Sequence, residues 1–195
     1  MIYPSHIDKE QVIQLPPCSI VGQIKIIDKP SEVKDAVKEL YKCSLIGFDT
    51  ETKPSFKRGE TNSISLLQLA TEECAYLFRL KMIGENEDLK KLLEDKNKMK
   101  VGLSVSDDFR SLIQWMKCKP TNFIELQRYV KAFGIEEMGL QKIFAILFNE
   151  RISKRQQLSN WEAVQLSPAQ QQYAAIDAWA CRNIYITLQN KVKEL

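Results

Sequence analysis

Histidine is nearly absent from this sequence, which contains a single histidine, His6, among 195 residues. That scarcity argues against a catalytic triad with a histidine base and against a metal site made of several histidines. The chain also lacks any apolar run of membrane-spanning length, and its first residues do not combine a basic start with an apolar stretch. We therefore expect neither a membrane span nor a signal peptide.

Cysteine is present, but its spacing follows no recognisable motif. The five cysteines are odd in number, are scattered along the chain and never form a C-x-x-C pair. This pattern argues against a disulfide scaffold and a zinc site, and it favours reduced thiols in a cytoplasmic protein. The net charge of +3 neither indicates nor excludes a nucleic-acid partner, because a local basic patch can bind nucleic acid without a large overall charge.

Length and composition indicate a soluble globular protein with one main domain. A hydrophobic content of 44% and a charged content of 27% are ordinary for this class, and 195 residues can enclose a sizeable core. Residues 1–19 include a charged stretch and Pro16-Pro17, so we expect them to form an arm over the surface. Residues 20–195 are expected to form a single domain.

The hydrophobic pattern predicts strands early in the chain and helices later. Strands are expected at 20–28, 45–51, 63–71, 74–80, 98–105 and the start of 123–133, and helices after 31, at 87–94, after 106, around 140–147 and from 168 to about 188. The last helix has a strong start signal, a capping box of Ser167 and Gln170 with Pro168 at the first helical position. This order, with at least one βαβ passage, predicts an α/β fold.

Two acids at the end of a buried strand are the first candidate site. The run LIGFDTE carries Asp49 and Glu51, which would share one face of the strand, while Thr50 would face the other side. Adjacent carboxylates repel each other and stay ionised most easily with a cation between them, and oxygen ligands suit Mg²⁺ or Mn²⁺. The alternative is a pair of solvated acids at a strand end.

Acids occur at two further places where a core-forming pattern would not put them. Asp107-Asp108 begins the helix that follows the strand VGLSV, and Asp177 lies in the middle of the last helix. Tyr173 comes one turn before Asp177, so both side chains share a face. The structural alternatives are a favourable helix-dipole position for the first pair and a hydrogen bond from Tyr173 for the buried Asp177.

These motifs, taken together, resemble those of the DEDD superfamily of 3′→5′ exonucleases. The likeness is to its tyrosine subclass (DEDDy), which includes ribonuclease D and the Werner-syndrome-type exonuclease domain. The first family motif, D-x-E, is FDTE here, and the third, Y-x-x-x-D, runs from Tyr173 to Asp177. In the second motif Asp108 lies six residues after Gly102 and four before Leu112, which favours Asp108 over Asp107. One departure is Asn160 in Ser-Asn-Trp, where the family commonly has Asp.

The resemblance implies a fold, an activity and a set of ligands. It implies a ribonuclease H-like mixed β-sheet flanked by α-helices, and a hydrolase that removes nucleoside 5′-monophosphates from the 3′ end of DNA or RNA. It further implies two divalent cations, Mg²⁺ or Mn²⁺, which would be held by Asp49, Glu51, Asp108 and Asp177. Tyr173 would hold the attacking water. The alternative is a catalytically silent module of the same fold that binds nucleic acid or protein, or a subunit that works within an assembly.

The substrate strand needs positive charge and surfaces for stacking. The candidates for these roles are Thr50, Lys53, Phe56, Lys57, Arg58, Leu67, Lys154, Arg155 and Trp161. For each cation the alternative is a solvated loop charge, and for Trp161 it is a place in the core. Leu67 is expected to line the sheet, and its alternative role is to separate the terminal bases of the strand. The sequence does not distinguish DNA from RNA, because contacts to a 2′-hydroxyl follow no local pattern.

Overall fold

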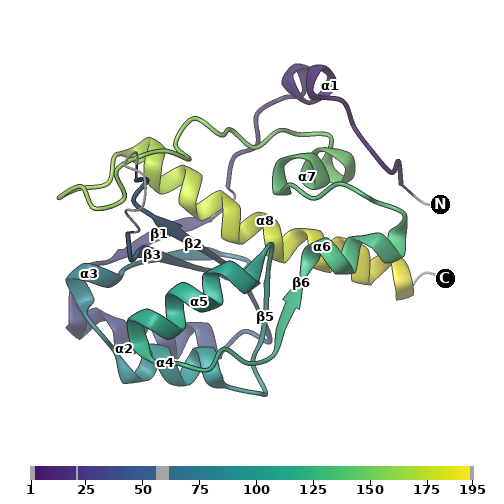
Figure 1. Cartoon of the computed structure of the whole chain (residues 1–195). Helices are drawn as coiled ribbons and strands as arrows, with labels where there is room; N and C mark the ends of the chain where they lie inside the picture. Colours follow the sequence, from purple (N-terminus) through teal and green to yellow (C-terminus); the bar gives the residue numbers. More distant parts are fainter. Residues whose placement is uncertain (1–2, 21, 56–61, 194–195) are drawn as a thin grey trace.

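A six-stranded mixed sheet forms the centre of the molecule (Figure 1), with the strand order β1-β4-β3-β2-β5-β6. The computed structural model describes residues 3–20, 22–55 and 62–193. β2 and β4 pair antiparallel with β3, and the β1–β4, β2–β5 and β5–β6 pairs are parallel. The strands are β1 Gln23–Ile27, β2 Leu45–Thr52, β3 Ile64–Ala70, β4 Cys74–Arg79, β5 Met99–Gly102 and β6 Phe123–Glu125. The predicted α/β class with a mixed sheet is confirmed.

Helices cover both faces of this sheet. The core beneath one face is made with α2, α4 and α5, whereas α7 and the long α8 pack on the other. The helices are α1 Lys9–Gln14, α2 Pro30–Tyr41, α3 Leu80–Ile83, α4 Glu87–Glu94, α5 Val105–Met116, α6 Leu126–Tyr129, α7 Leu140–Phe148 and α8 Pro168–Lys193, with a 3-10 turn at Val130–Phe133. The short α1 and α3 were not predicted, because one turn of helix leaves no clear periodicity. Within the described ranges, none of the helices has the length and apolarity to cross a membrane.

The central strand β2 divides its side chains between the two helical layers. Ile46 and Phe48 are fully buried in the core that includes α2, α4 and α5. Gly47 faces α8, and a Cβ atom there would lie 2.0 Å from the carbonyl oxygen of Ala178. Glycine is therefore required at this position, because the backbones of β2 and α8 approach more closely than a side chain allows. This contact places the helix residue before Ala178, which is Asp177, next to the acidic end of β2.

The start of α8 follows the predicted capping box. The Gln170 amide donates to the Ser167 hydroxyl at 3.2 Å, and the Ser167 amide donates to the Gln170 side-chain oxygen at 3.0 Å. These bonds satisfy two amides that a helix start leaves unpaired. The helix continues to Lys193, beyond the predicted end near Leu188, because Leu188 is only its last buried residue and the final turn faces solvent.

The N-terminal arm is bound to residues that flank α7. The Glu136 amide donates to the Ser5 carbonyl at 2.9 Å on one side of the helix. On the other side the Arg151 amide donates to Pro16, and the Cys18 amide donates to Arg151. The arm therefore lies against the domain through backbone hydrogen bonds, over the α7 side of the molecule (Figure 1).

Candidate metal and nucleic-acid site

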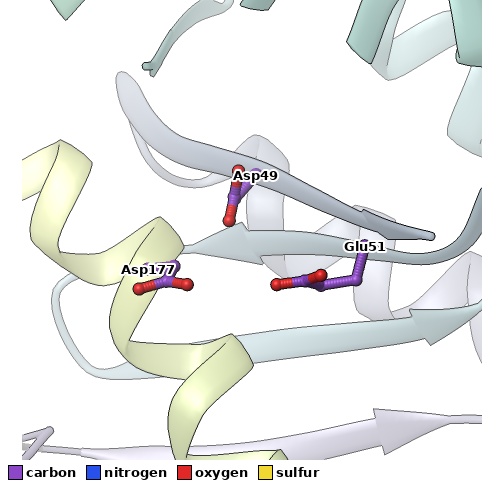
Figure 2. A group of neighbouring side chains, drawn as sticks. All are labelled: Asp49, Glu51 and Asp177. Atoms are coloured by element: carbon purple, nitrogen blue, oxygen red, sulfur yellow. The ribbon is translucent and has the colours of Figure 1, made fainter. Parts of the chain in front are cut away.

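Three carboxylates from distant parts of the chain meet above β2. Asp49 and Glu51 point from the strand toward α8, which presents Asp177 to them (Figure 2). One oxygen from each of the three carboxylates lies within 4.8 Å of the other two. The strand alternation and the close β2–α8 contact together produce this cluster. The structure therefore brings together three of the four acids that the sequence motifs selected.

The fourth acid, Asp108, lies beside this group on the first turn of α5. The Thr50 hydroxyl donates a hydrogen bond to its carboxylate. The charge of Asp108 also raises the pKa of both Asp49 and Glu51, which places it within electrostatic reach of them. Asp107 instead is exposed and pairs with Arg110 at 3.4 Å. Of the two neighbouring aspartates, Asp108 is the one that lies near the cluster.

Glu125, which the sequence did not indicate, fixes the start of α5. Its two carboxylate oxygens accept hydrogen bonds from the amides of Ser104 and Val105, each at 2.9 Å. Ser104 has a left-handed conformation with φ 59°, which turns the chain from β5 into the helix. Glu125 therefore sets the position of the turn that carries Asp108. A carboxylate that caps a helix from another strand has no local sequence signal, so pattern reasoning could not find it.

The acids of the cluster hold protons more tightly than isolated carboxyls. Burial, followed by the charges of Asp177 and Asp108, raises the pKa of Glu51 to about 9. Burial raises the pKa of Asp177 to about 7, although a hydrogen bond from Tyr173 lowers it. Burial and the three neighbouring acids raise the pKa of Asp49 well above its ordinary value. In each case the ionised form of the carboxyl is less stable in this site than it is in water.

This donor set fits a hard divalent cation. All the converging atoms are carboxylate oxygens, the ligands that Mg²⁺ and Mn²⁺ prefer. A bound cation would offset the burial and the mutual repulsion that raise these pKa values, because it supplies the opposite charge. The acidic cluster is therefore compatible with divalent metal ions.

Tyr173 lies one turn before Asp177 and interacts with it by a side-chain hydrogen bond. Burial and the charges of Asp177, Glu51 and Asp49 raise the pKa of the Tyr173 phenol above its ordinary value. The hydroxyl therefore stays protonated at neutral pH and can donate. The Trp161 ring packs beside it, with 5.9 Å between ring centroids.

Two candidates for substrate contact, Trp161 and Leu67, are buried, which confirms the alternatives of a core position for Trp161 and a sheet-lining position for Leu67. Trp161 is 1% exposed and belongs to the core between the sheet and α8, so it presents no surface for a base to stack on. Leu67 is fully buried in the core on the other side of the sheet, so it cannot separate terminal bases. Both residues instead support the layers that carry the acids.

Three of the remaining substrate-binding candidates lie among the described residues, and three lie outside them. Lys154 is exposed, and its charge lowers the pKa of Asp177, so it lies near the acidic cluster. Arg155 is also exposed, and Lys53 pairs with Glu162 at 3.6 Å. Phe56, Lys57 and Arg58 lie outside the described residues.

Gln68 is a further polar residue at the base of the site. It is directly opposite Asp49 in the register of β2 and β3, and it is fully buried. Neither atom of its side-chain amide has a hydrogen-bond partner among the described residues. A buried amide without partners is uncommon in folded proteins. The sequence showed only a glutamine within an apolar strand, which gave no indication of this position.

Comparisons with known proteins match this chain to exonucleases. A family model described as 3′-5′ exonuclease matches residues 24–193. The chain is 29% identical over 180 residues to the mouse bifunctional 3′-5′ exonuclease/ATP-dependent helicase WRN. The match covers 89% of this chain and 13% of that protein. It is 34% identical over 146 residues to exonuclease 3′-5′ domain-containing protein 2 of Drosophila melanogaster, covering 72% of this chain and 24% of that protein. The chain thus spans a minor part of these relatives.

A solved structure shares the fold. The Aedes aegypti Nibbler EXO domain superposes with a TM-score of 0.76 at 23% identity, and the match covers 88% of this chain and 89% of that one. At this identity the superposition establishes the arrangement of the sheet and helices.

Proposed function

Because this chain belongs to the family of 3′-5′ exonucleases, we propose that it hydrolyses the terminal phosphodiester bond of a nucleic-acid strand and releases a nucleoside 5′-monophosphate from the 3′ end. The observation that carries this proposal is the convergence of Asp49, Glu51 and Asp177, with Asp108 beside them. In the reaction a water oxygen bonds to phosphorus while the bond from phosphorus to the 3′ oxygen breaks, and a proton passes to that leaving oxygen.

Two divalent cations, Mg²⁺ or Mn²⁺, are part of this proposal. The carboxylates of Asp49, Glu51, Asp177 and Asp108 would hold them. When bound, such cations lower the pKa of a water molecule and offset the negative charge of the phosphate. The raised pKa values of Glu51 and Asp177 support this assignment, because these buried carboxylates lack the opposite charge that a cation would supply.

The chain's own side chains would bind and orient the reacting groups. Tyr173, which stays protonated, would donate a hydrogen bond to the attacking water and hold it in line with the phosphorus atom. Thr50 would hold the Asp108 carboxylate in a fixed position beside the cluster through its hydrogen bond. Lys154 would pair with a phosphate of the strand, because it is exposed and close to Asp177.

The test uses single strands of DNA and of RNA, each labelled at the 5′ or the 3′ end, in Mn²⁺, Mg²⁺ or chelator. We expect the 3′ label to appear first as a mononucleotide, and the 5′-labelled strand to shorten in single-nucleotide steps. Activity should disappear in chelator. The DNA and RNA strands compared side by side identify the substrate class.

The main alternative is a module of the same fold that binds without cleaving. The presence of all four carboxylates and Tyr173 argues against it, since a binding module has no use for a complete metal-ligand set. Stable binding of strands with no cleavage in either metal would favour this alternative.

We further propose that residues 20–195 are the exonuclease domain, that residues 1–19 are an accessory arm, and that the protein acts in the cytoplasm. The family match over 24–193 supports the first assignment. Five scattered cysteines, all free in the structure, suit a reducing compartment. Localisation of a tagged full-length protein by microscopy tests the last point.

A further inference from the structure

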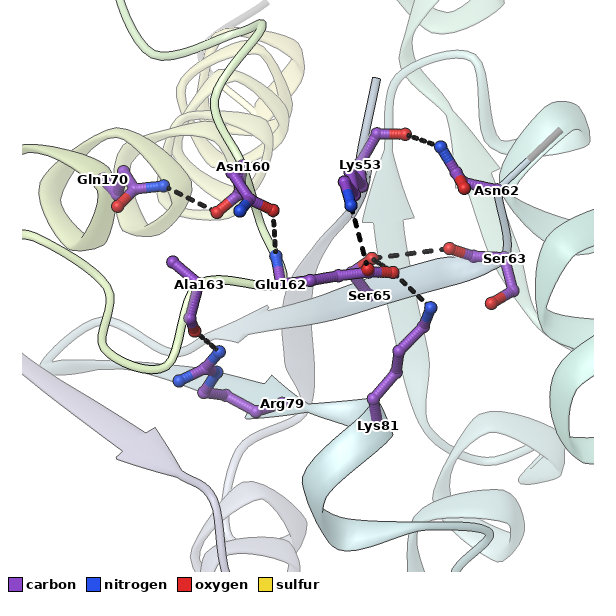
Figure 3. A network of polar contacts seen from close by, with 10 residues as sticks. All are labelled: Lys53, Asn62, Ser63, Ser65, Arg79, Lys81, Asn160, Glu162, Ala163 and Gln170. Atoms are coloured by element: carbon purple, nitrogen blue, oxygen red, sulfur yellow. Dashed lines mark hydrogen bonds and ion pairs between the residues drawn. The ribbon is translucent and has the colours of Figure 1, made fainter. Parts of the chain in front are cut away.

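Glu162 occupies the centre of a cationic cluster at the end of the sheet where β2 and β4 finish and β3 begins (Figure 3). Its carboxylate pairs with Lys81 and, at 3.6 Å, with Lys53. It also accepts a hydrogen bond from the Ser65 hydroxyl at 3.3 Å. Two ammonium groups and a hydroxyl from three different segments thus converge on one anion.

The segment that carries Glu162 is anchored by other bonds. Arg79 is buried, and its guanidinium donates to the carbonyl oxygens of Ala163 and Val164. On the other side of Glu162, the Gln170 side chain donates to the carbonyl of Asn160 at 3.2 Å. The Glu162 carboxylate is therefore not needed to hold this segment, since backbone carbonyls on both sides of it are already bound.

The two lysines differ from Arg79 in being accessible. The side chains of Lys53 and Lys81 are 43% and 40% exposed, and that of Glu162 is 22% exposed. Exposed ion pairs between flexible side chains add little stability, because screening and lost side-chain freedom offset the attraction. A cavity of about 240 Å³ adjoins the cluster and is lined by Ser65, Lys81 and Glu162 among others. An anion from solution can therefore reach these groups.

The cluster lies beside the residues assigned above to catalysis. Lys53 follows Glu51 by two residues along the chain. Glu162 follows Trp161, whose ring packs against Tyr173. A strand with its 3′ end at the acidic cluster would therefore pass close to Lys53 and Lys81.

We propose that Lys53, Lys81 and Ser65 form a binding site for a phosphodiester group of the substrate strand, and that Glu162 fills this site as an internal anion until the strand displaces it. The inference rests on the proposed function, because it takes the ligand to be the strand that the enzyme shortens. Its chemistry is that of backbone recognition, in which lysine and hydroxyl groups contact phosphate oxygens without reading sequence. On displacement, the partly exposed Glu162 carboxylate turns to solvent.

The first test neutralises the internal anion. In chelator, where no cleavage occurs, the Kd of a fluorescent single strand is measured across a range of salt concentrations for the wild type and for Glu162→Gln. We expect Glu162→Gln to bind several-fold more tightly at low salt. The dependence of log K on log salt should steepen by about 0.7 for each additional phosphate contact. The matched control is Glu39→Gln, which removes the same charge from another exposed pair, with Lys42 at 2.6 Å.

Equal binding by Glu162→Gln and Glu39→Gln would overturn the proposal, as would weaker binding by a folded Glu162→Gln. Lys81→Gln gives an independent test should Glu162→Gln fail to fold. We expect it to weaken binding and to reduce the salt dependence, and an unchanged Kd and slope would overturn the proposal. Cleavage by the wild type in Mn²⁺ separates the two ideas. If the wild type cleaves but Glu162→Gln and Lys81→Gln leave binding unchanged, the phosphate site alone is rejected. If the wild type neither binds nor cleaves the strand, the proposed function is rejected as well.

Discussion

The Thr50 hydroxyl donates a hydrogen bond to the Asp108 carboxylate. This bond joins β2, which carries Asp49 and Glu51, to α5, which carries Asp108. Thr50 faces away from Asp49 and Glu51, as the alternation of β2 requires. Asp108 comes from α5, which packs on the face of the sheet opposite α8. The hydrogen bond from Thr50 holds this acid next to the cluster that forms against α8. The site therefore depends on a residue that need not touch the substrate.

Replacing Thr50 with valine should weaken catalysis without unfolding the protein. The change keeps the shape of the side chain but removes the donor, at a cost of about 1 kcal/mol for the hydrogen bond. We expect turnover to fall by about fivefold, since that energy difference corresponds to roughly a fivefold rate change. Steady-state cleavage of a labelled strand measures it. Thr50→Ser retains the hydroxyl and should keep most of the activity; equal losses in both variants would argue against the hydrogen bond.

The two aspartates at the start of α5 allow a matched comparison. Asp108→Asn should lower turnover by about a hundredfold or more, the size of loss seen when a charge-stabilising group at a reacting centre is removed. Asp107→Asn makes the same chemical change one residue away, on an exposed side chain, and should leave turnover near that of the wild type. Cleavage rates in saturating Mn²⁺ decide the point. Similar losses in the two variants would contradict the assignment of Asp108.

Replacing Asp49 with asparagine should lower activity but raise the stability of the metal-free protein. Asp49→Asn should abolish cleavage, because it removes a ligand from the centre of the cluster. In chelator the same variant should melt at a higher temperature than the wild type, because burial and three neighbouring charges oppose the ionised Asp49 carboxylate. Thermal unfolding with and without Mn²⁺ tests this. Full activity would count against the metal assignment, and a lower melting temperature in chelator would count against the raised pKa of Asp49.

The stability of the metal-free protein should fall as pH rises. The pKa of Glu51 is raised to about 9 and that of Asp177 to about 7, whereas carboxyls in an unfolded chain titrate near about 4. Between these limits the folded state binds more protons than the unfolded state, so the free energy of unfolding decreases with pH. We expect the melting temperature in chelator to decline from about pH 5 to about pH 9.

Divalent metal should counteract this decline, because it binds the ionised carboxylates of the folded state. The rise in melting temperature on adding Mn²⁺ should therefore be larger at high pH than at low pH. Glu51→Gln removes one of the shifted groups and should flatten the pH dependence in chelator. A metal-free protein that becomes more stable toward high pH would contradict the raised pKa values.

Tyr173→Phe tests the orientation of the water. The phenyl ring preserves the packing against Trp161, while the hydroxyl that contacts Asp177 is lost. We expect turnover to fall by about tenfold to a hundredfold, as misplacement of a reacting group does. Metal affinity, measured by calorimetry, should change little, because the four carboxylates remain. Unchanged turnover at saturating metal would rule out a water-orienting role.

Local sequence patterns predicted several elements of the fold around the site. The apolar stripe of Val33, Ala36, Val37 and Leu40 is buried on α2, as its helical spacing indicates. The hairpin of β3 and β4 and the helix Glu87–Glu94 also lie where they were expected. These features depend on spacing along the chain, which is what a sequence displays directly.

Features that depend on distant partners were not predictable. Lys100 stands in a strand yet is fully buried, because its ammonium donates to the carbonyls of Leu92, Leu93 and Asp95 at the end of α4. Nothing in the strand pattern indicates such a partner. The burial of Trp161 has the same cause, since it depends on how a segment without regular structure folds back onto the sheet.

The absence of a side chain at Gly47 sets how far apart the acidic residues can be. With 2.0 Å between a hypothetical Cβ and the Ala178 carbonyl, even a methyl group would lift α8 away from the strand. Asp177 would move with the helix, while Asp49 would stay behind on β2. The spacing of the proposed ligands is thus fixed by bare backbone, so one methyl group at Gly47, a residue that offers no group to metal or substrate, would widen the distance between Asp49 and Asp177 and impair the proposed cleavage.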